Sequence, residues 1–463
     1  MARPNLVVFV SDDQGYEDLS CMGSTDVRTP HLDALAASGA LLTDWYANSP
    51  VCTPSRASLL TGRYPGNAGV RSILSGFRTT PGLRTEVPTL SSVLRAAGYR
   101  TGWFGKWHLG AAPGFRPQDH GFEDTFGFHA GSVDYYSHIY YGGDKREIVV
   151  NGRRTRGTPV HDLWRGGEEV YRDGRYLTEL IGDHTVDFVR ACTSDDRPFL
   201  LYVPFNAPHY PMHAPQLYKD RFPDLPPERQ IMTAMISAMD DAVGRVLAEL
   251  DRQHVRDDTM CLFMSDNGPS REVRNWLDGS QQPYYGGSAG TLKGHKFSLF
   301  EGGIRVPGIV SWPGRIPAGQ VVSEPAAAID LYPTFLNAAG IEPPDGHVDG
   351  VDIMGMLTAG EPSPHDALMW EQGDQTAVRR GRWKLVLNGR LVEREEPQDE
   401  VFLADLTADN GERVNLAHSH PETVDELRHL AETWRDGIEE RWRSHWLPRI
   451  PDYATHVQPA FME

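Results

Sequence analysis

Asn5-Leu6-Val7-Val8-Phe9-Val10 forms a continuous apolar run that ends in the polar triplet Ser11-Asp12-Asp13. A short run of this kind, rich in β-branched and aromatic residues, is typical of a parallel strand that is buried on both faces. Open α/β sheets bind ligands at the carboxyl ends of such strands, which is where the two acids stand. The stretch therefore indicates an α/β fold with a candidate site at one edge of its sheet.

Two later stretches repeat this pattern. Residues 199–203 lead to His209, and residues 260–264 lead to Asp266 and Asn267. Helical patterns lie between the strand-like runs, at residues 31–38, 89–97 and 230–250. The alternation of strand and helix predicts a large, mostly parallel sheet sandwiched by helices.

The chain of 463 residues is longer than one core usually organises. The sequence changes in character near position 362, so we predict a catalytic domain at 1–362 and a smaller C-terminal α+β subdomain at 363–463. In that subdomain, residues 377–387 resemble two short strands around a turn, and 421–440 resemble a helix. Residues 114–175 show weak periodicity, which predicts long loops that could shape a substrate pocket.

The composition limits the classes of partner. The formal charge of −18 repels polyanions, so no nucleic-acid partner is expected, and an anionic substrate would need a local basic pocket. No stretch approaches the roughly 20 apolar residues of a membrane helix. The four cysteines are scattered, which fits neither a disulfide framework nor a zinc site. No signal peptide is recognisable, so we expect a cytoplasmic protein, although a secreted chain without its leader would look the same.

The segment Cys52-Thr53-Pro54-Ser55-Arg56-Ala57-Ser58-Leu59-Leu60-Thr61-Gly62 is the most informative in the chain. Taken alone, Cys52 could be a structural thiol or a thiolate nucleophile with a lowered pKa. The acids that follow the predicted strands offer hard oxygen ligands for calcium or magnesium. An Asp-Asp pair after a strand is, however, also typical of a turn or a helix cap.

The chain resembles the sulfatase family in four segments. They are the Cys-x-Pro-x-Arg element at Cys52, Gly105-Lys106-Trp107-His108-Leu109-Gly110, the Pro-His-x-Pro element at 208–211, and the lysine five residues before Glu301-Gly302-Gly303. The resemblance is dense from Asn5 to about Pro307. It implies an alkaline phosphatase-like fold and the hydrolysis of sulfate esters. It also implies that a formylglycine-generating enzyme oxidises Cys52 to formylglycine, whose hydrated diol is the nucleophile.

The resemblance also implies roles for the residues of these segments. Arg56 would orient the diol, Lys106 would contact the nucleophile and a substrate oxygen, and His108 would exchange a proton with the diol. His209 would be the general acid toward the leaving alcohol, with His213 as its rival.

The other roles concern charge. Lys296, selected over Lys293 by its register, would bind sulfate, whereas Glu301 and Arg305 would form a structural ion pair. The cation, calcium as first choice and magnesium as second, would be held by Asp12, Asp13, the modified side chain at Cys52, Asp266 and Asn267.

Several alternatives stay open at this point. Relatives with the same chemistry hydrolyse phosphonate or phosphate esters, and a cysteine hydrolase or an inactive binding protein would be of another class. Residues 131–138 contain Tyr135-Tyr136-Ser137-His138, which resembles a stretch in some sulfatases of N-acetylgalactosamine 4-sulfate. This hints at a carbohydrate substrate, although the aromatic side chains could equally stack on an aryl sulfate.

Overall fold

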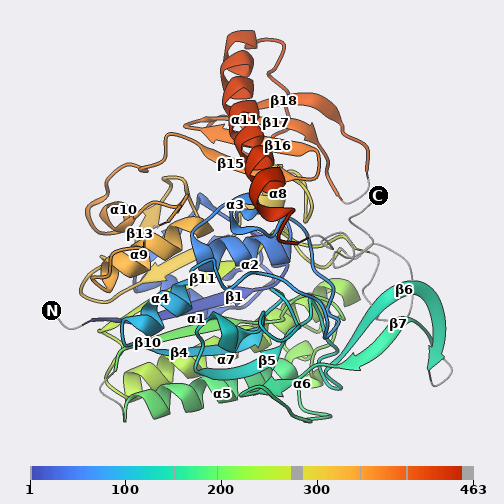
Figure 1. The fold of residues 1–463 in the computed structure, drawn as a ribbon, viewed down its shortest axis with the longest axis vertical. Coiled ribbons are helices and arrows are strands. Elements are labelled where there is room, and N and C mark those ends of the chain that lie inside the picture. The colour runs from blue at the N-terminus through green and yellow to red at the C-terminus, as the bar shows by residue number, and fades with distance from the viewer. Residues whose placement is uncertain are drawn as a thin grey trace.

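The computed structural model describes residues 3–150, 153–194, 197–272, 285–344, 346–392 and 395–450. A ten-stranded mixed sheet runs through the larger part of the chain (Figure 1). Its central strand β1 (Asn5–Ser11) lies between β10 (Phe199–Pro204) and β11 (Thr259–Ser265), and all three are parallel. The carboxyl ends of the three predicted strands therefore meet at one edge, as the sequence pattern indicated.

The sheet is parallel at its centre and contains antiparallel pairs on both sides, while the outermost pair β13–β2 is again parallel. Its order is β13-β2-β12-β11-β1-β10-β4-β5-β8-β9. The pairs β11–β12, β12–β2, β5–β8 and β8–β9 are antiparallel. The remaining strands of this sheet are β13 (Gln320–Val322), β2 (Ala40–Leu42), β12 (Gly308–Ser311), β4 (Arg100–Lys106), β5 (Asp124–Phe128), β8 (Trp164–Arg165) and β9 (Glu168–Glu169).

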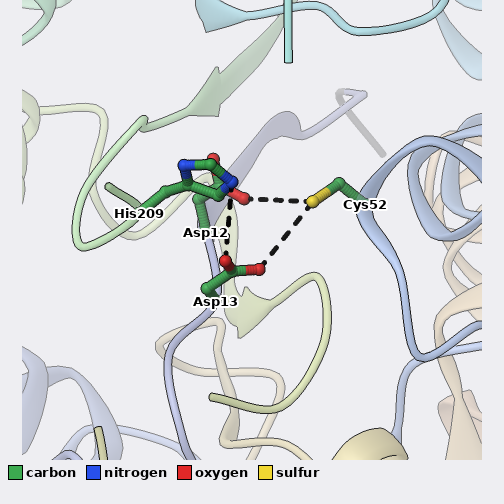
Figure 2. Close-up of side chains that lie close together, drawn as sticks. All are labelled: Asp12, Asp13, Cys52 and His209. Carbon is green, nitrogen blue, oxygen red and sulfur yellow. Dashed lines mark hydrogen bonds and ion pairs between the residues drawn. The ribbon is translucent and has the colours of Figure 1, made fainter. Parts of the chain in front are cut away.

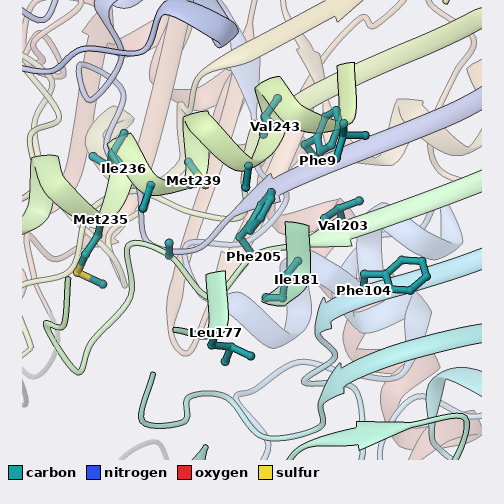
Figure 3. Close-up of a cluster of buried hydrophobic side chains, with 14 of the residues drawn as sticks. Phe9, Phe104, Leu177, Ile181, Val203, Phe205, Met235, Ile236, Met239 and Val243 are labelled. Atoms are coloured by element: carbon teal, nitrogen blue, oxygen red, sulfur yellow. The ribbon is translucent and has the colours of Figure 1, made fainter. Parts of the chain in front are cut away.

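Helices cover both faces of the sheet, as predicted. One core contains Val7 and Phe9 of β1, and Figure 3 shows Phe9 beside Val243. The other contains Leu6 and Val8, because successive side chains of a strand point to opposite faces. The first face is covered by α1 (Pro30–Ala37), α5 (Leu177–Cys192) and α7 (Pro227–Arg252). The second is covered by α2 (Cys52–Thr61), α4 (Leu90–Ala96) and α9 (Leu331–Ala338). The three helices expected from periodicity are present, with ends that differ by up to three residues.

A small antiparallel sheet and one long helix form the C-terminal part, which confirms its α+β character. The sheet has the order β15-β16-β17-β18, and Val378 and Leu385 pack against Leu427 of the helix. These elements are β15 (Leu368–Gln372), β16 (Gln375–Arg380), β17 (Trp383–Gly389), β18 (Asp399–Asp405) and α11 (Pro421–Arg441). The division at 362/363 stays a prediction, and residues 451–463 lie outside the described part.

The expectation of long loops at 114–175 was wrong for about half of that segment, which forms strands. β5 belongs to the main sheet, and β6 (Ile139–Val150) pairs with β7 (Arg153–His161) in a two-stranded sheet that projects from the body (Figure 1). The sequence of this hairpin is rich in glycine and charged residues, so it lacks the alternation of apolar and polar residues by which strands are recognised.

The remaining elements are short. They are η1 (Ser20–Met22), β3 (Trp45–Tyr46), α3 (Pro65–Ala68), η2 (Pro117–His120), α6 (Gln216–Lys219), α8 (Glu301–Ile304), β14 (Ala326–Ala327), η3 (Ala328–Asp330), α10 (Met354–Ala359) and η4 (Trp442–Trp446). Among the described residues, no helix combines the length and the apolar character needed to cross a membrane.

Candidate active site

Cys52 and the two acids after β1 form the centre of the candidate site. Cys52 is the first residue of α2, and its Sγ lies 3.5 Å from Oδ1 of Asp12 and 3.8 Å from Oδ1 of Asp13 (Figure 2). His209, from the loop after β10, completes the group. One ligand atom from each of these four buried residues lies within 4.8 Å of the others. Segments that are distant in sequence therefore converge on position 52.

Three buried cations surround this centre, each paired with an acid. Nζ of Lys106 lies 2.6 Å from Oδ2 of Asp12, and Nζ of Lys296 lies 2.9 Å from Oδ2 of Asp13. Arg56, one turn beyond Cys52 on α2, pairs with Asp266 at 2.7 Å. The basic residues expected for anion binding are thus brought together, and buried carboxylates balance their charge.

Glu272 also belongs to the site, and sequence reasoning missed it. Its Oε2 lies 2.8 Å from Nζ of Lys296. It follows the Asp266-Asn267-Gly268 segment in a loop, where neither a strand nor a helix pattern and none of the four quoted segments draws attention to it.

The electrostatic environment differs among the central groups. Burial raises the pKa of Asp12 to about 7. Burial acts in the same direction on Asp13, but the charges of Lys296, His209 and Lys106 lower its pKa to about 2. Burial also raises the pKa of the Cys52 thiol well above its ordinary value. An unmodified Cys52 would therefore stay protonated, which disfavours the cysteine-hydrolase alternative.

The structure separates the two candidate histidines of the loop after β10. Nε2 of His209 lies 3.5 Å from Asp13, and its Nδ1 donates to the carbonyl oxygen of Tyr210 at 2.7 Å. His213 lies instead against Asp134, with its Nδ1 3.3 Å from that carboxylate. Only His209 of the two is part of the cluster around Cys52.

His108 departs from the extended geometry that the sequence suggested. β4 ends at Lys106, and His108 has a φ of 57°, in the left-handed region. Its Nε2 donates to the carbonyl oxygen of Leu74 at 3.0 Å, while its buried Nδ1 has no hydrogen-bond partner among the described residues. Burial, followed by the charge of Lys106, lowers the pKa of His108 well below its ordinary value, so the ring is neutral near pH 7.

The residues around Asp13 fit a divalent cation. The Nδ2 of Asn267 donates to Asp13 at 2.7 Å, whereas its buried Oδ1 has no hydrogen-bond partner in the part of the chain that the structure describes. An amide oxygen and two carboxylates are the hard donors that calcium and magnesium prefer. Asp266 is more engaged than the sequence implied, since Oδ2 pairs with Arg56 and Oδ1 accepts from the backbone N–H of Asp13 at 3.2 Å.

The other charged residues of the segment around Lys296 also have defined contacts. Nζ of Lys293 lies over the rings of Phe300 and Phe402, 4.1 and 3.9 Å from their centroids, and not against the central acids. The expected ion pair between Glu301 and Arg305 is present at 3.2 Å. Lys293, Glu301 and Arg305 thus make contacts of their own, whereas Lys296 reaches Asp13 in the site.

A family model described as Sulfatase matches residues 4–341, nearly three quarters of the chain. The chain belongs to the sulfatase family. A second model, described as the C-terminal part of N-sulphoglucosamine sulphohydrolase, matches residues 294–436 of this sulfatase.

Known relatives agree over nearly the whole length. N-acetylgalactosamine-6-sulfatase of Sus scrofa is 32% identical, over 92% of this chain and 84% of that protein. Arylsulfatase A of Homo sapiens is 31% identical, over 92% of this chain and 87% of that protein. Among solved structures, Ps i-CgsB in complex with k-i-k-neocarrahexaose is 29% identical, with a TM-score of 0.81, over 97% of this chain and 99% of that one.

These likenesses make the chain a sulfuric ester hydrolase. The phosphonate alternative is not favoured. The phosphonate monoester hydrolase of Agrobacterium radiobacter is 22% identical, with a TM-score of 0.65 over 94% of this chain and 96% of that one, and this likeness shows the fold alone.

Proposed function

We propose that this sulfatase releases inorganic sulfate from a carbohydrate sulfate ester, with formylglycine formed from Cys52 as its nucleophile. One observation carries the proposal. The side chain at position 52 contacts Asp12 and Asp13, and the other oxygens of these two acids face Lys106, Lys296 and His209. A tetrahedral anion placed against position 52 would therefore meet cations on two sides.

Formylglycine would supply a hydrated aldehyde, of which one hydroxyl attacks sulfur and the other later loses its proton, so that sulfate leaves and the aldehyde returns. His108 is suited to accept that proton. Its Nε2–H is fixed on the carbonyl of Leu74, which leaves the lone pair of Nδ1 available. Its lowered pKa keeps the ring neutral, as a base requires.

His209 is suited to the leaving alcohol. The carbonyl of Tyr210 holds Nδ1–H, so Nε2 is the nitrogen directed into the site, as Figure 2 shows. Burial lowers the pKa of His209 to about 4, so Nε2 is unprotonated near pH 7 before the substrate binds. The negative charge of a bound sulfate ester would favour protonation of Nε2, and that proton would pass to the departing oxygen. Lys106 and Lys296 would bind sulfate oxygens, and Arg56 would keep Asp266 and the start of α2 in place.

A divalent cation, calcium as first choice, would be held by Asp12, Asp13, Asn267 and an oxygen at position 52, with Asp266 alongside. Bound there, it would offset the negative charge of the substrate and favour ionisation at position 52. The raised pKa of Asp12 fits this assignment, because a nearby positive charge would help that buried carboxylate to ionise.

The substrate class is argued from the relatives and from the loop around Tyr135. The relatives include a protein named for N-acetylgalactosamine sulfate and a structure that holds a carbohydrate. Tyr135 is fully buried, and its hydroxyl lies 2.8 Å from the carbonyl oxygens of both Asn206 and His209. Tyr135 thus braces the His209 loop and does not offer its ring to an aryl substrate.

A substrate panel combined with mass spectrometry tests the proposal. The panel contains N-acetylgalactosamine 4-sulfate and 6-sulfate, a sulfated galactan oligosaccharide, an aryl sulfate and a matched phosphonate ester. We expect at least one sugar sulfate to be cleaved with a higher kcat/KM than the aryl sulfate. Faster turnover of the phosphonate by orders of magnitude would refute the assignment.

Cys52→Ala is the matching variant for the nucleophile. We expect an active sample to weigh less than its sequence by the mass of H₂S minus that of an oxygen atom. The variant should lose activity by on the order of a thousandfold or more, as is seen when a nucleophile is removed. A fully active Cys52→Ala protein, or an active sample without the mass deficit, would contradict formylglycine chemistry.

A further inference from the structure

A second group of potential ligands lies at the base of the β6–β7 hairpin. One ring nitrogen each of His138 and His161 and a carboxylate oxygen of Asp173 lie within 4.8 Å of one another. His138 immediately precedes β6, His161 is the last residue of β7, and Asp173 lies in the segment before α5. None of the three has a role in the proposed sulfatase chemistry.

The outer hydrogen bonds of the two histidines define which nitrogen is free. Nε2 of His138 lies 3.2 Å from the carbonyl oxygen of Arg175, and a carbonyl can only accept, so Nε2 carries the proton. Nδ1 of His161 donates to Oε1 of Glu169 at 2.9 Å. The nitrogens left with lone pairs are Nδ1 of His138 and Nε2 of His161. Both are buried and have no hydrogen-bond partner among the residues that the structure describes.

This arrangement matches the way proteins prepare histidines for a metal. A ligating histidine almost always donates its other N–H to a carboxylate or a backbone carbonyl, which fixes the ring and its tautomer. Here His138 donates to a backbone carbonyl and His161 donates to a carboxylate. Without a metal, two buried nitrogens would each lack a partner, which is costly, and His138 is wholly buried.

We propose that Nδ1 of His138, Nε2 of His161 and the carboxylate of Asp173 bind a zinc ion, separate from the cation at Cys52. Two neutral imidazoles and one carboxylate form a common three-ligand zinc set, with the fourth position open to solvent. Calcium or magnesium would prefer oxygen ligands. Bond lengths of about 2.0–2.2 Å require the three atoms to draw closer, and Asp173 is exposed and can move.

The position of the site suggests what the zinc ion would do. It would join three segments of the insertion at the base of the hairpin. The backbone N–H of His138 donates to the backbone carbonyl of Asp134. The next residue, Tyr135, donates its hydroxyl to the carbonyl of His209. The backbone N–H of Gly174, next to Asp173, donates to Tyr136 at 2.8 Å. Zinc binding should therefore stiffen the wall beside the His209 loop.

Zinc titration of the full chain tests the proposal. The parent protein carries Cys52→Ser, so that no thiol binds zinc at the active site, and calcium is kept saturating. Bound zinc is measured by elemental analysis after gel filtration, and its ligands by X-ray absorption. We expect one equivalent of zinc with nitrogen and oxygen ligands.

Variants then assign the ligands. His161→Gln and Asp173→Asn should each weaken zinc binding by roughly tenfold or more, and the matched surface variant His418→Gln should not. Glu169→Gln removes no ligand but should still weaken binding, because it alters the acceptor that orients His161. Thermal unfolding without zinc checks that each variant folds. If His161→Gln does not fold, Asp173→Asn still tests the site, because Asp173 is exposed and its replacement disturbs the fold less. Absence of the zinc equivalent in the parent, or its undiminished retention in a folded ligand variant, would overturn the proposal.

Discussion

Nζ of Lys384, on strand β17 of the C-terminal sheet, lies 2.8 Å from Oε1 of Glu301, and both side chains are fully buried. Glu301 begins α8, five residues after Lys296. Burial acts to raise the pKa of Glu301, but the charges of Lys384 and Arg305 lower this pKa to about 2, so the carboxylate is ionised. The C-terminal sheet therefore supplies a charge beneath the segment that carries Lys296 into the active site.

Replacing Lys384 with methionine should destabilise the whole protein. Removing Lys384 leaves Glu301 paired with Arg305 and takes from the buried Glu412 a cation 3.2 Å away. Breaking a buried ion pair typically costs about 3–5 kcal/mol of unfolding free energy. Urea unfolding measures this loss. Lys219→Met, on the short helix α6, is the control and should stay within about 0.5 kcal/mol of the parent. Equal stability of the two variants would show that the pair does not support the fold.

Lys296→Ala and Lys293→Ala should differ in activity. Lys296 contacts Asp13 and Glu272, whereas Lys293 lies over two phenylalanine rings. Removing a charge that stabilises the transition state typically lowers kcat by roughly 10²–10³-fold, so we expect this for Lys296→Ala. Lys293→Ala should keep kcat within severalfold. Steady-state kinetics on a sulfate ester decide, and the reverse order of the two variants would reassign the sulfate-binding lysine.

Removal of the cation should abolish activity reversibly. We expect a chelator to lower both kcat and Tm and calcium to restore them, because bound ligand stabilises the folded state. Asn267→Ala should raise the calcium concentration needed for recovery, since it removes the free Oδ1. Asn337→Ala, which alters a surface contact with Asp352, is the control. Full activity after exhaustive chelation would contradict a metal-dependent mechanism.

The stability of the protein should fall in mild acid through His129. This buried ring stacks on Trp103 and Trp164, and burial lowers its pKa to about 3. The unfolded chain takes up the proton near pH 6.5, so between these values it binds more protons than the folded chain, and stability is lost as pH falls. At pH 5 this amounts to about 2 kcal/mol relative to pH 8.

His129→Phe keeps the stacking and removes the proton site. The pH dependence of its unfolding free energy between pH 8 and pH 5 should therefore be shallower by about that amount. His418→Phe, at an exposed position, should leave the dependence unchanged. An unaltered slope in His129→Phe would mean that other buried groups cause the acid sensitivity.

Much of the fold could be predicted because β1, β10 and β11 are buried on both faces and read as unbroken apolar runs. The segments after them could be placed at one edge for the same reason. The β6–β7 hairpin could not be predicted, since its sequence carries no alternating pattern. Nor could the left-handed backbone at His108, because the sequence shows a histidine two residues after a lysine and not the turn between them.

In the candidate site, too, some residues could be predicted from the sequence and others could not. The motif residues were predicted because the resemblance fixed their register, and the structure brings Cys52, Asp12, Asp13 and His209 together. Glu272 and the support of Glu301 by Lys384 depend on contacts between distant segments, which no local pattern reveals.

Cys52 exposes only 1% of its surface, and this has a consequence for when the side chain can be oxidised. A maturation enzyme must reach the thiol, but in the folded protein α2 packs on the main sheet. The central strand β1 of that sheet is flanked by β10 and β11, and synthesis of β11 is complete only at residue 265. We therefore expect the proposed oxidation to take place during synthesis, while the nascent chain is still open. A protein that folds before it is oxidised should remain inactive when the maturation enzyme is added afterwards.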